Sequence, residues 1–164
     1  MNNEIIIALK IIFLLGFTLH NLEEAIWLPE WSKYAEKYHK PVERNEFIFA
    51  VIVITTLGYI ITLLDIVYGY PGSTINYIFL GFTGMMGLNS IFPHLIATIV
   101  LKKYAPGLLT GIFLNLPISL IIIISYLQAG LNIYLFLIST AFVSMLVLYS
   151  LKYLFILGGK FIRF

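Results

Sequence analysis

Five long apolar runs set the strongest limit on how this chain can fold. They cover residues 5–27, 47–67, 75–101, 108–127 and 131–156. An α-helix of about 20 apolar residues is long enough to cross a bilayer, so each run can span. We therefore predict an all-α bundle of five transmembrane helices, built as a single membrane domain over residues 1–164.

The composition excludes a soluble fold. Only 11% of the residues are charged and 60% are hydrophobic, whereas a soluble domain carries charge on about a quarter of its residues. An ordinary soluble enzyme is therefore excluded, and we expect membrane lipid as a partner and no nucleic acid. The chain contains no cysteine, so a cysteine thiolate is excluded both as a nucleophile and as a metal ligand.

Basic residues predict the orientation of the bundle. Nine of the ten fall in the first loop, the third loop or the C-terminal end: Lys33, Lys37, Lys40, Arg44, Lys102, Lys103, Lys152, Lys160 and Arg163. With five spans these nine share one side, which predicts an external N-terminus and a cytoplasmic C-terminus in a bacterial or archaeal cytoplasmic membrane. Lys10 should snorkel to the outer surface, and Asp65 should cap its helix or snorkel there.

The segment over residues 28–46 has a helical pattern of its own. Trp27, Trp31, Tyr34 and Tyr38 recur at spacings of four, three and four, which places them on one helical face. This pattern predicts a helix lying in the cytoplasmic interface with its aromatic side toward lipid. Such a helix would act as an anchor, or as a lid over the end of the first span.

Three ionisable residues stand near the cytoplasmic end of the first run. His20, Glu23 and Glu24 are related by i, i+3 and i+4, so they project from one helical face. A charge deep in a bilayer costs about 2.5–3.5 kcal/mol even on insertion-based scales. These side chains should therefore face the bundle interior and have partners there.

The third run carries a histidine at the same expected depth. At ~1.5 Å per residue, His20 lies ~10 Å below Trp27 and His94 ~12 Å below Lys102, two residues that mark the cytoplasmic ends of their spans. Asn115 lies ~13 Å into the fourth span by the same rise. The two histidines and this asparagine can therefore belong to one polar layer.

Pro93 predicts a kink beside that layer, because its ring removes an N–H group and clashes with the carbonyl of Asn89. Asn89 and His94 would point about 140° apart in a straight helix, and a kink could bring them closer. The predicted layer in the cytoplasmic half of the bundle contains His20, Glu23, Glu24, His94, Asn89 and Asn115.

Three motifs in this order resemble the HXXEE family of small integral membrane proteins. The sequence contains His-Asn-Leu-Glu-Glu at 20–24, an asparagine before a histidine at 89 and 94, and Tyr-Ala-Pro-Gly-Leu-Leu-Thr at 104–110. The family patterns are His-x-x-Glu-Glu, Asn-x-x-x-His and Tyr-x-Pro-Gly-x-x-Thr, and the second has four intervening residues here. The resemblance covers roughly residues 20–110 and implies a site without naming its chemistry.

The third motif also has a structural interpretation, which we rank first. Pro106 and Gly107 form a turn or helix start, Tyr104 lies at the interface, and Thr110 can bond within the first helical turn. Alternatively, Tyr104 and Thr110, together with Asn89 and Asn115, contact the substrate or support the site residues.

The first functional hypothesis is a metal centre. Histidine nitrogens and glutamate oxygens bind zinc, iron or manganese. His20, His94 and either Glu23 or Glu24 could hold one ion, leaving the other glutamate to bridge a second ion or to act as general base. The predicted reaction is metal-assisted hydrolysis of a lipid-soluble or amphipathic molecule, and two histidines are few for iron-dependent oxidation.

Three alternatives remain open from the sequence. Glu23 and Glu24 could perform acid–base chemistry on a lipid or isoprenoid without a metal, one protonated and the other ionised. A proton-coupled carrier could use the same residues as a relay, although five spans would then have to work as a homodimer. Finally, the cluster could serve only to hold the helices together.

Overall fold

The computed structural model describes residues 3–38 and 40–161, and every regular element in these ranges is helical. Arg163, one of the basic residues behind the predicted orientation, lies outside them. The described chain forms five helical passes that are long and apolar enough to cross a membrane. The predicted all-helical fold with five passes that could span a membrane is therefore confirmed.

Three passes are single helices and two are interrupted. The passes consist in order of α1 (Asn3–Ser32), α2 (Arg44–Tyr68), α3 with η2 and α4 (Thr74–Asn89, Ser90–Leu95, Ile96–Leu101), α5 with η3 and α6 (Leu108–Thr110, Gly111–Asn115, Leu116–Gln128), and α7 (Ile133–Phe161). Both interruptions, η2 and η3, are π-helical turns.

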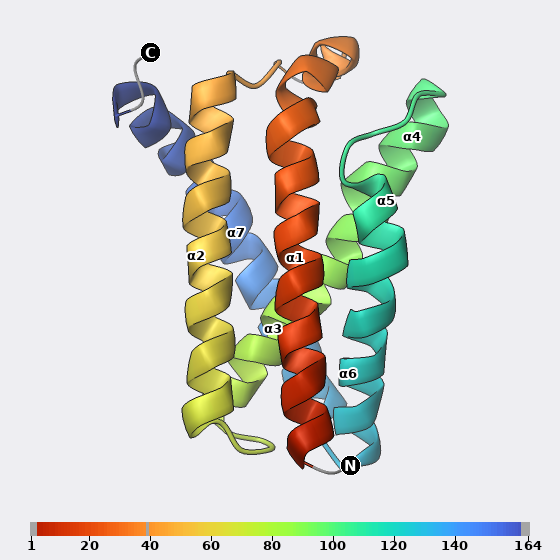
Figure 1. The fold of residues 1–164 in the computed structure, drawn as a ribbon, viewed down its shortest axis with the longest axis vertical. Coiled ribbons are helices and arrows are strands. Elements are labelled where there is room, and N and C mark those ends of the chain that lie inside the picture. Colours follow the sequence, from red (N-terminus) through yellow and green to blue (C-terminus); the bar gives the residue numbers. More distant parts are fainter. Residues whose placement is uncertain (1–2, 39, 162–164) are drawn as a thin grey trace.

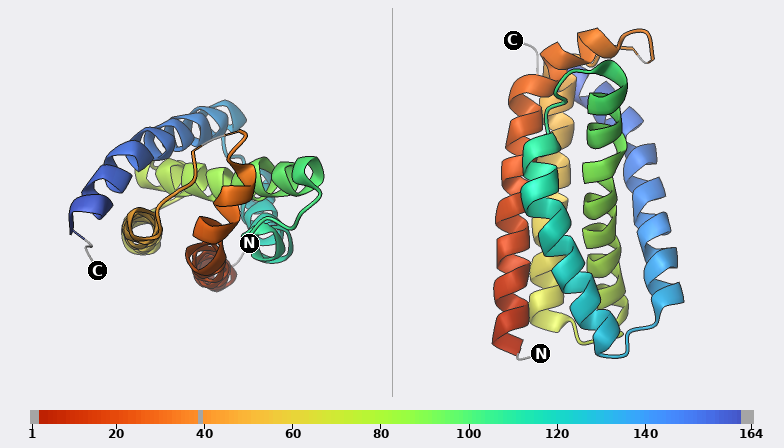
Figure 2. Two further views of the ribbon diagram at one scale, coloured as in Figure 1. Left: turned by 90° about the horizontal axis from the view of Figure 1, so that it is seen from above. Right: turned by 90° about the vertical axis from the view of Figure 1, so that its right-hand side faces the viewer.

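The passes run alternately up and down, so that α1 begins and α7 ends at opposite ends of the bundle (Figure 1). Seen from above, α3 lies in the middle, with α7 on one side and α1, α2 and α6 on the other (Figure 2). The close packing of α3 on α7 needs small residues. A Cβ atom added to Gly84 would lie 2.7 Å from the Thr140 hydroxyl oxygen.

Aromatic side chains fill the centre of the bundle. Phe13 and Phe17 of α1 meet Phe79 and Phe82 of α3 with edge-to-face rings, and all four are buried. The outer faces of the helices are also apolar, for example at Ile138, which is 64% exposed. An interior core combined with apolar outer faces is expected where lipid replaces water as the solvent.

The helical segment after the first pass is shorter than the predicted interfacial helix over residues 28–46, and it lies across that end of the bundle (Figure 2). Helix α1 continues through Pro29 to Ser32, and only a short 3₁₀ turn, η1 (Lys33–Ala35), follows it. The aromatic spacing therefore belongs in part to an extension of the first pass. Tyr34 and Tyr38 are 63% and 62% exposed, so this end still presents aromatic rings outward.

The prediction that Lys10 and Asp65 snorkel to the surface is wrong. The Lys10 Nζ atom lies 2.6 Å from Asp65 Oδ2, and both side chains are buried. Asn76 Nδ2 donates to the same carboxylate over 3.2 Å. These residues face one another across α1, α2 and α3, and a charge that finds a partner of opposite sign inside the bundle does not need to reach the surface.

Candidate metal centre

A break in the third pass brings two site residues together. Phe92 has an extended backbone (φ −123°, ψ 117°) before Pro93, so the chain steps out of the helix between Asn89 and His94. As a result, Asn89 Nδ2 lies 3.2 Å from His94 Nε2. The four intervening residues of this motif are therefore compatible with direct contact, as the predicted kink allowed.

Three ionisable side chains converge between α1 and this break. Glu24 Oε1 lies 2.9 Å from His94 Nε2 and 3.7 Å from His20 Nε2, and the possible ligand atoms of the three residues all lie within 4.8 Å of one another. The two imidazole rings meet edge to face with their centroids 5.0 Å apart. His20 and His94 are fully buried, whereas the side chain of Glu24 keeps 15% exposure.

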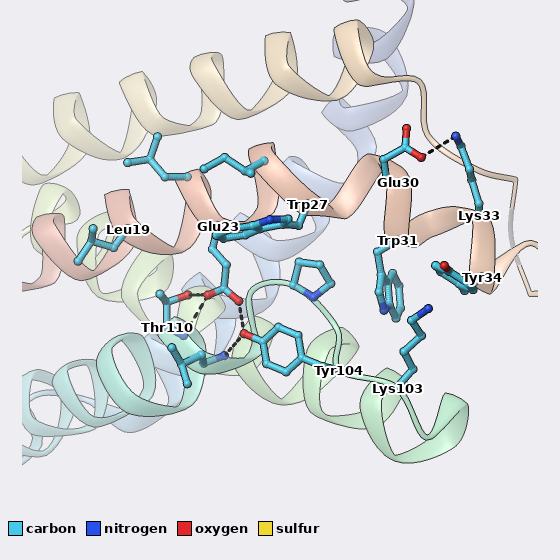
Figure 3. Close-up of a pocket in the computed structure, with 14 residues that line it drawn as sticks. Leu19, Glu23, Trp27, Glu30, Trp31, Lys33, Tyr34, Lys103, Tyr104 and Thr110 are labelled. Carbon is cyan, nitrogen blue, oxygen red and sulfur yellow. Dashed lines mark hydrogen bonds and ion pairs between the residues drawn. The ribbon is translucent and has the colours of Figure 1, made fainter.

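A hydrogen-bond chain fixes the tautomer of His20. Thr110 Oγ1 donates its single proton to Glu23 Oε2 over 2.6 Å (Figure 3). The same hydroxyl oxygen lies 3.2 Å from His20 Nδ1, so Nδ1 has to be the donor to it. In the neutral ring, Nε2 is then the nitrogen with a free lone pair, and it faces Glu24 and Asn89.

The loop between the third and fourth passes closes the site. Gly107 has φ +94°, and a Cβ atom added there would lie 2.6 Å from His94 Cε1 and 2.9 Å from His20 Cε1. No side chain fits at this point. From the sequence, Pro106 and Gly107 predict only a turn, because a Pro-Gly pair carries no sign that two histidine rings pack against it.

Tyr104 and Thr110 hold Glu23 at this loop. The Tyr104 hydroxyl and the Thr110 hydroxyl donate to different oxygens of the Glu23 carboxylate, and the Thr110 amide donates to Oε2 over 3.2 Å. Partial burial and the bond to Glu23 raise the pKa of Tyr104 to about 12. The phenol therefore stays protonated at neutral pH and remains a donor. The third motif supports the site in addition to forming a turn.

Four of the predicted site residues form the centre itself. His20, Glu24, His94 and Asn89 meet directly, and Asn89 Nδ2 also lies 3.0 Å from His20 Nε2. Glu23 is outside this group of ligand atoms and touches it only through Thr110.

Asn115 of η3 is buried beside Gly16 of α1, one helical turn before His20. A Cβ atom added to Gly16 would lie 3.2 Å from Asn115 Oδ1. Its side-chain amide has no hydrogen-bond partner in the described part of the chain. Asn115 therefore adjoins the polar layer without bonding to the histidines or glutamates.

The contact between His94 Nε2 and Glu24 Oε1 has two possible occupants. A proton on His94 Nε2 satisfies it by donation to Glu24 over 2.9 Å. A metal ion between the two atoms does so only when the Asn89 amide turns away, because Asn89 Nδ2 lies 3.0 Å and 3.2 Å from the two Nε2 lone pairs that the ion would use. Ligand atoms around a tetrahedral zinc ion are about 3.3 Å apart, from bond lengths of about 2.0–2.1 Å. The two separations from Glu24 Oε1, 2.9 and 3.7 Å, lie on either side of that value.

Comparison with known proteins identifies relatives. The model of the family described as "Protein of unknown function with HXXEE motif" matches residues 11–122. The protein named "Uncharacterized protein YrkK" from Bacillus subtilis (strain 168) is 48% identical over 149 residues, which cover 90% of this chain and 94% of that protein. No solved structure matches the chain.

Proposed function

The chain belongs to the HXXEE family, and from its own site we propose that it is a metal-dependent membrane enzyme of the hydrolase type. Its substrate is a lipid-soluble or amphipathic molecule. The observation that carries this proposal is the meeting of His20, Glu24 and His94, with their possible ligand atoms within 4.8 Å of one another. Two histidines and one glutamate form the ligand set of one group of hydrolytic zinc enzymes.

Each residue at the centre has a separate role in this proposal. His20 Nε2, His94 Nε2 and a Glu24 oxygen hold the ion, and the proposed ions are zinc, iron and manganese. When bound, the ion supplies Lewis-acid activation of water or of a substrate oxygen. Glu23 is a positioning residue. It accepts the Thr110 proton, so that His20 Nδ1 donates to Thr110 and His20 Nε2 keeps its lone pair. Such support of a metal-binding histidine raises its basicity.

We also propose an orientation for the bundle. The ends of α1, α4 and α7 and the start of α2 lie at one end of the bundle (Figure 1). The described basic residues other than Lys10 belong to the segments at that end. By the positive-inside rule this end faces the cytoplasm, in a bacterial or archaeal cytoplasmic membrane, and the His20 centre lies in that half of the bundle.

Metal analysis tests the proposal. The protein is purified in detergent without a chelator or a histidine tag, as the wild type, His20→Ala and Glu24→Gln, with Glu36→Gln as a control for losing an exposed carboxylate. We expect about one zinc, iron or manganese ion per chain in the wild type and the control, and its loss from the other two. A folded wild type that stays metal-free after titration with each ion would refute the proposal.

One observation supports a second candidate. A proton on His94 Nε2 alone satisfies the Glu24–His94 contact, and the 2.9 Å separation suits a direct hydrogen bond. A metal-free acid–base enzyme acting on a lipid or isoprenoid would then use this pair. A folded, metal-free protein whose lipid turnover falls in Glu24→Gln would favour it over the metal centre.

A further inference from the structure

A groove opens on the outer side of α1 next to the candidate metal centre. It has a volume of about 880 Å³ and lies between the end of α1 and the loop leading into α5 (Figure 3). Leu19, Leu22 and Ile26 of α1 and Leu109 of α5 line its apolar part, and each is about half exposed. A groove of this size is typical of sites for small ligands, and its apolar part fits a hydrocarbon chain.

The inner wall of the groove is formed by residues that hold the site. Glu23, Tyr104 and Thr110 line the groove and are bonded to one another there. Thr110 also contacts His20 on the far side. A single side chain, that of Thr110, would therefore separate a molecule in the groove from the candidate metal centre.

The end of the groove nearest η1 has donors without acceptors. The Trp31 Nε1 atom is buried and has no hydrogen-bond partner within the described ranges. The Lys103 ammonium lies over the Tyr34 ring, and the described residues offer it no carboxylate. Lys33 is already paired with Glu30 over 2.7 Å. In Figure 3 the Lys103 ammonium lies beside the Trp31 ring. Because Nε1 has no accessible surface, a ligand oxygen reaches it only when the side chains around it move apart.

We propose that this groove binds a membrane lipid with a phosphate headgroup, and that this lipid is the substrate class of the enzyme. The phosphate oxygens accept from Trp31 Nε1 and from Lys103, and a hydrocarbon chain lies along Leu19, Leu22 and Leu109. An anion that accepts both bonds satisfies a buried N–H group and an ammonium group together. The identification of the lipid as substrate rests on the proposed function, whereas the binding itself does not.

The positions along α1 restrict which part of the lipid could react. Trp31 and Glu23 are eight residues apart, or ~12 Å along the helix. A phosphate held at Trp31 and Lys103 is thus remote from Glu23 and Thr110, and the part of the ligand beside them belongs to its chain or to the linkage below the headgroup. The phosphate would serve for binding, and the reaction would take place deeper in the membrane.

Fluorescence gives a direct measure of occupancy, because both tryptophans of the chain, Trp27 and Trp31, line this groove. The protein in dodecyl maltoside is titrated with dodecyl phosphate carrying a brominated chain, which quenches nearby indoles. Brominated dodecyltrimethylammonium tests whether the chain alone suffices, and inorganic phosphate as competitor tests whether the headgroup alone does. We expect saturable quenching by the phosphate amphiphile, weak quenching by the cationic one and no competition by millimolar phosphate.

Two adjacent lysines provide a matched pair of variants. Lys103→Gln should weaken dodecyl phosphate binding about tenfold, the size expected for one charge-assisted hydrogen bond. Trp31→Phe should weaken it several-fold while Trp27 still reports. Lys102→Gln removes the same charge from an exposed residue outside the groove lining and should leave binding unchanged. Equal losses in both lysine variants, or equal quenching by the cationic amphiphile, would overturn the proposal.

The same titration on Glu24→Gln separates the binding site from the enzyme. We expect this variant to bind dodecyl phosphate like the wild type although it lacks a proposed metal ligand. Specific binding in a wild type that holds no metal would support the groove and refute the metal-dependent function. A wild type that contains metal but shows no saturable quenching would refute lipid binding in the groove and leave the metal centre standing.

Discussion

Thr110 shows how far the candidate centre depends on one hydroxyl proton. The proton goes to Glu23 over 2.6 Å, so His20 Nδ1, 3.2 Å from the same oxygen, has to donate. Two hydrogen bonds therefore decide which nitrogen of a fully buried ring keeps its lone pair. A threonine sixteen residues after His94 thus acts on the chemistry of the first span.

Replacement of this threonine tests its role. Thr110→Val keeps the shape of the side chain and removes both hydrogen bonds, which frees His20 to adopt the other tautomer. We expect metal affinity to fall about 10–100-fold, as when other supports of metal-binding histidines are lost. Competition with a chromophoric chelator measures the change. Thr56→Val, whose hydroxyl bonds only to the Ile52 carbonyl of its own helix, should match the wild type. Equal metal affinity of Thr110→Val and the wild type would show that the Thr110 hydroxyl does not fix the tautomer of His20.

Gly107 can be compared with a second glycine of similar backbone conformation. Gly107 has φ +94° and Gly72 has φ +86°, but a Cβ atom on Gly72 would meet nothing within 4 Å. Alanine at either position costs about 1 kcal/mol of backbone strain. In Gly107→Ala the methyl group also strikes both histidine rings, which adds about 1–3 kcal/mol by overpacking. Thermal unfolding in detergent should place Gly107→Ala clearly below Gly72→Ala, and equal melting temperatures would contradict the packing of this loop on the histidines.

The bond from Tyr104 to Glu23 predicts a pH dependence at the alkaline end. The pKa of Tyr104 is raised from 10.0 to about 12. Because the folded value lies above the ordinary one, the stabilisation is fully present below pH 10 and is lost as the pH rises through about 12. The melting temperatures of the wild type and Tyr104→Phe, measured from pH 8 upward, should differ by a constant amount up to about pH 10 and then converge. A difference that disappears nearer neutral pH would mean that the phenol ionises early.

At the scale of elements, the two interrupted passes are the ones that build the site. The π-helical turns η2 and η3 pack against each other, since a Cβ atom on Gly111 would lie 3.1 Å from Ser90 Cβ. Such turns shift the helical register and are frequent at functional sites. Here they allow Asn89 and His94 to face the same point, and Thr110, just before η3, to reach Glu23 and His20.

The sequence predicted the spans and the four residues that meet at the centre, because hydropathy and depth are properties of each helix alone. It could not predict how the helices rotate about their axes. Rotation decides that Lys10 meets Asp65 inside the bundle, and that Glu24 faces His94 while Glu23 faces the loop. The roles of Tyr104 and Gly107 depend on how that loop folds back, which the Pro-Gly signal does not specify.

The Lys10–Asp65 pair joins α1 to α2 and, through Asn76, to α3. Lys10→Met leaves a buried carboxylate whose remaining partner among the described residues is the Asn76 amide, and we expect a loss of about 3–5 kcal/mol in the free energy of unfolding. Lys10→Met combined with Asp65→Asn removes both charges and should recover most of the loss. Denaturant titration in mixed micelles measures each value. A double variant less stable than Lys10→Met would show that the pair is not the main interaction of either residue.

At the scale of the whole molecule, charge separates the two ends of the bundle. Lys102 follows α4 at the end where basic residues gather, whereas Ala129, in the turn before α7, lies at the opposite end, where the loops at 68–74 and 128–130 hold no basic residue (Figure 1). Both residues are exposed. The positive-inside rule then predicts that Ala129 lies outside the cell and Lys102 inside it.

Cysteine labelling can decide this orientation without background, because the chain contains no cysteine of its own. In intact cells, a membrane-impermeant maleimide should label Ala129→Cys and leave Lys102→Cys unlabelled, and permeabilisation should make both react. Labelling of Lys102→Cys alone in intact cells would show that the bundle has the opposite orientation. The groove beside α1 would then open into the outer leaflet, and its phosphate lipid would have to come from that side. The orientation thus determines which leaflet supplies the proposed substrate, since Lys103, which holds the phosphate, follows Lys102 directly in the sequence.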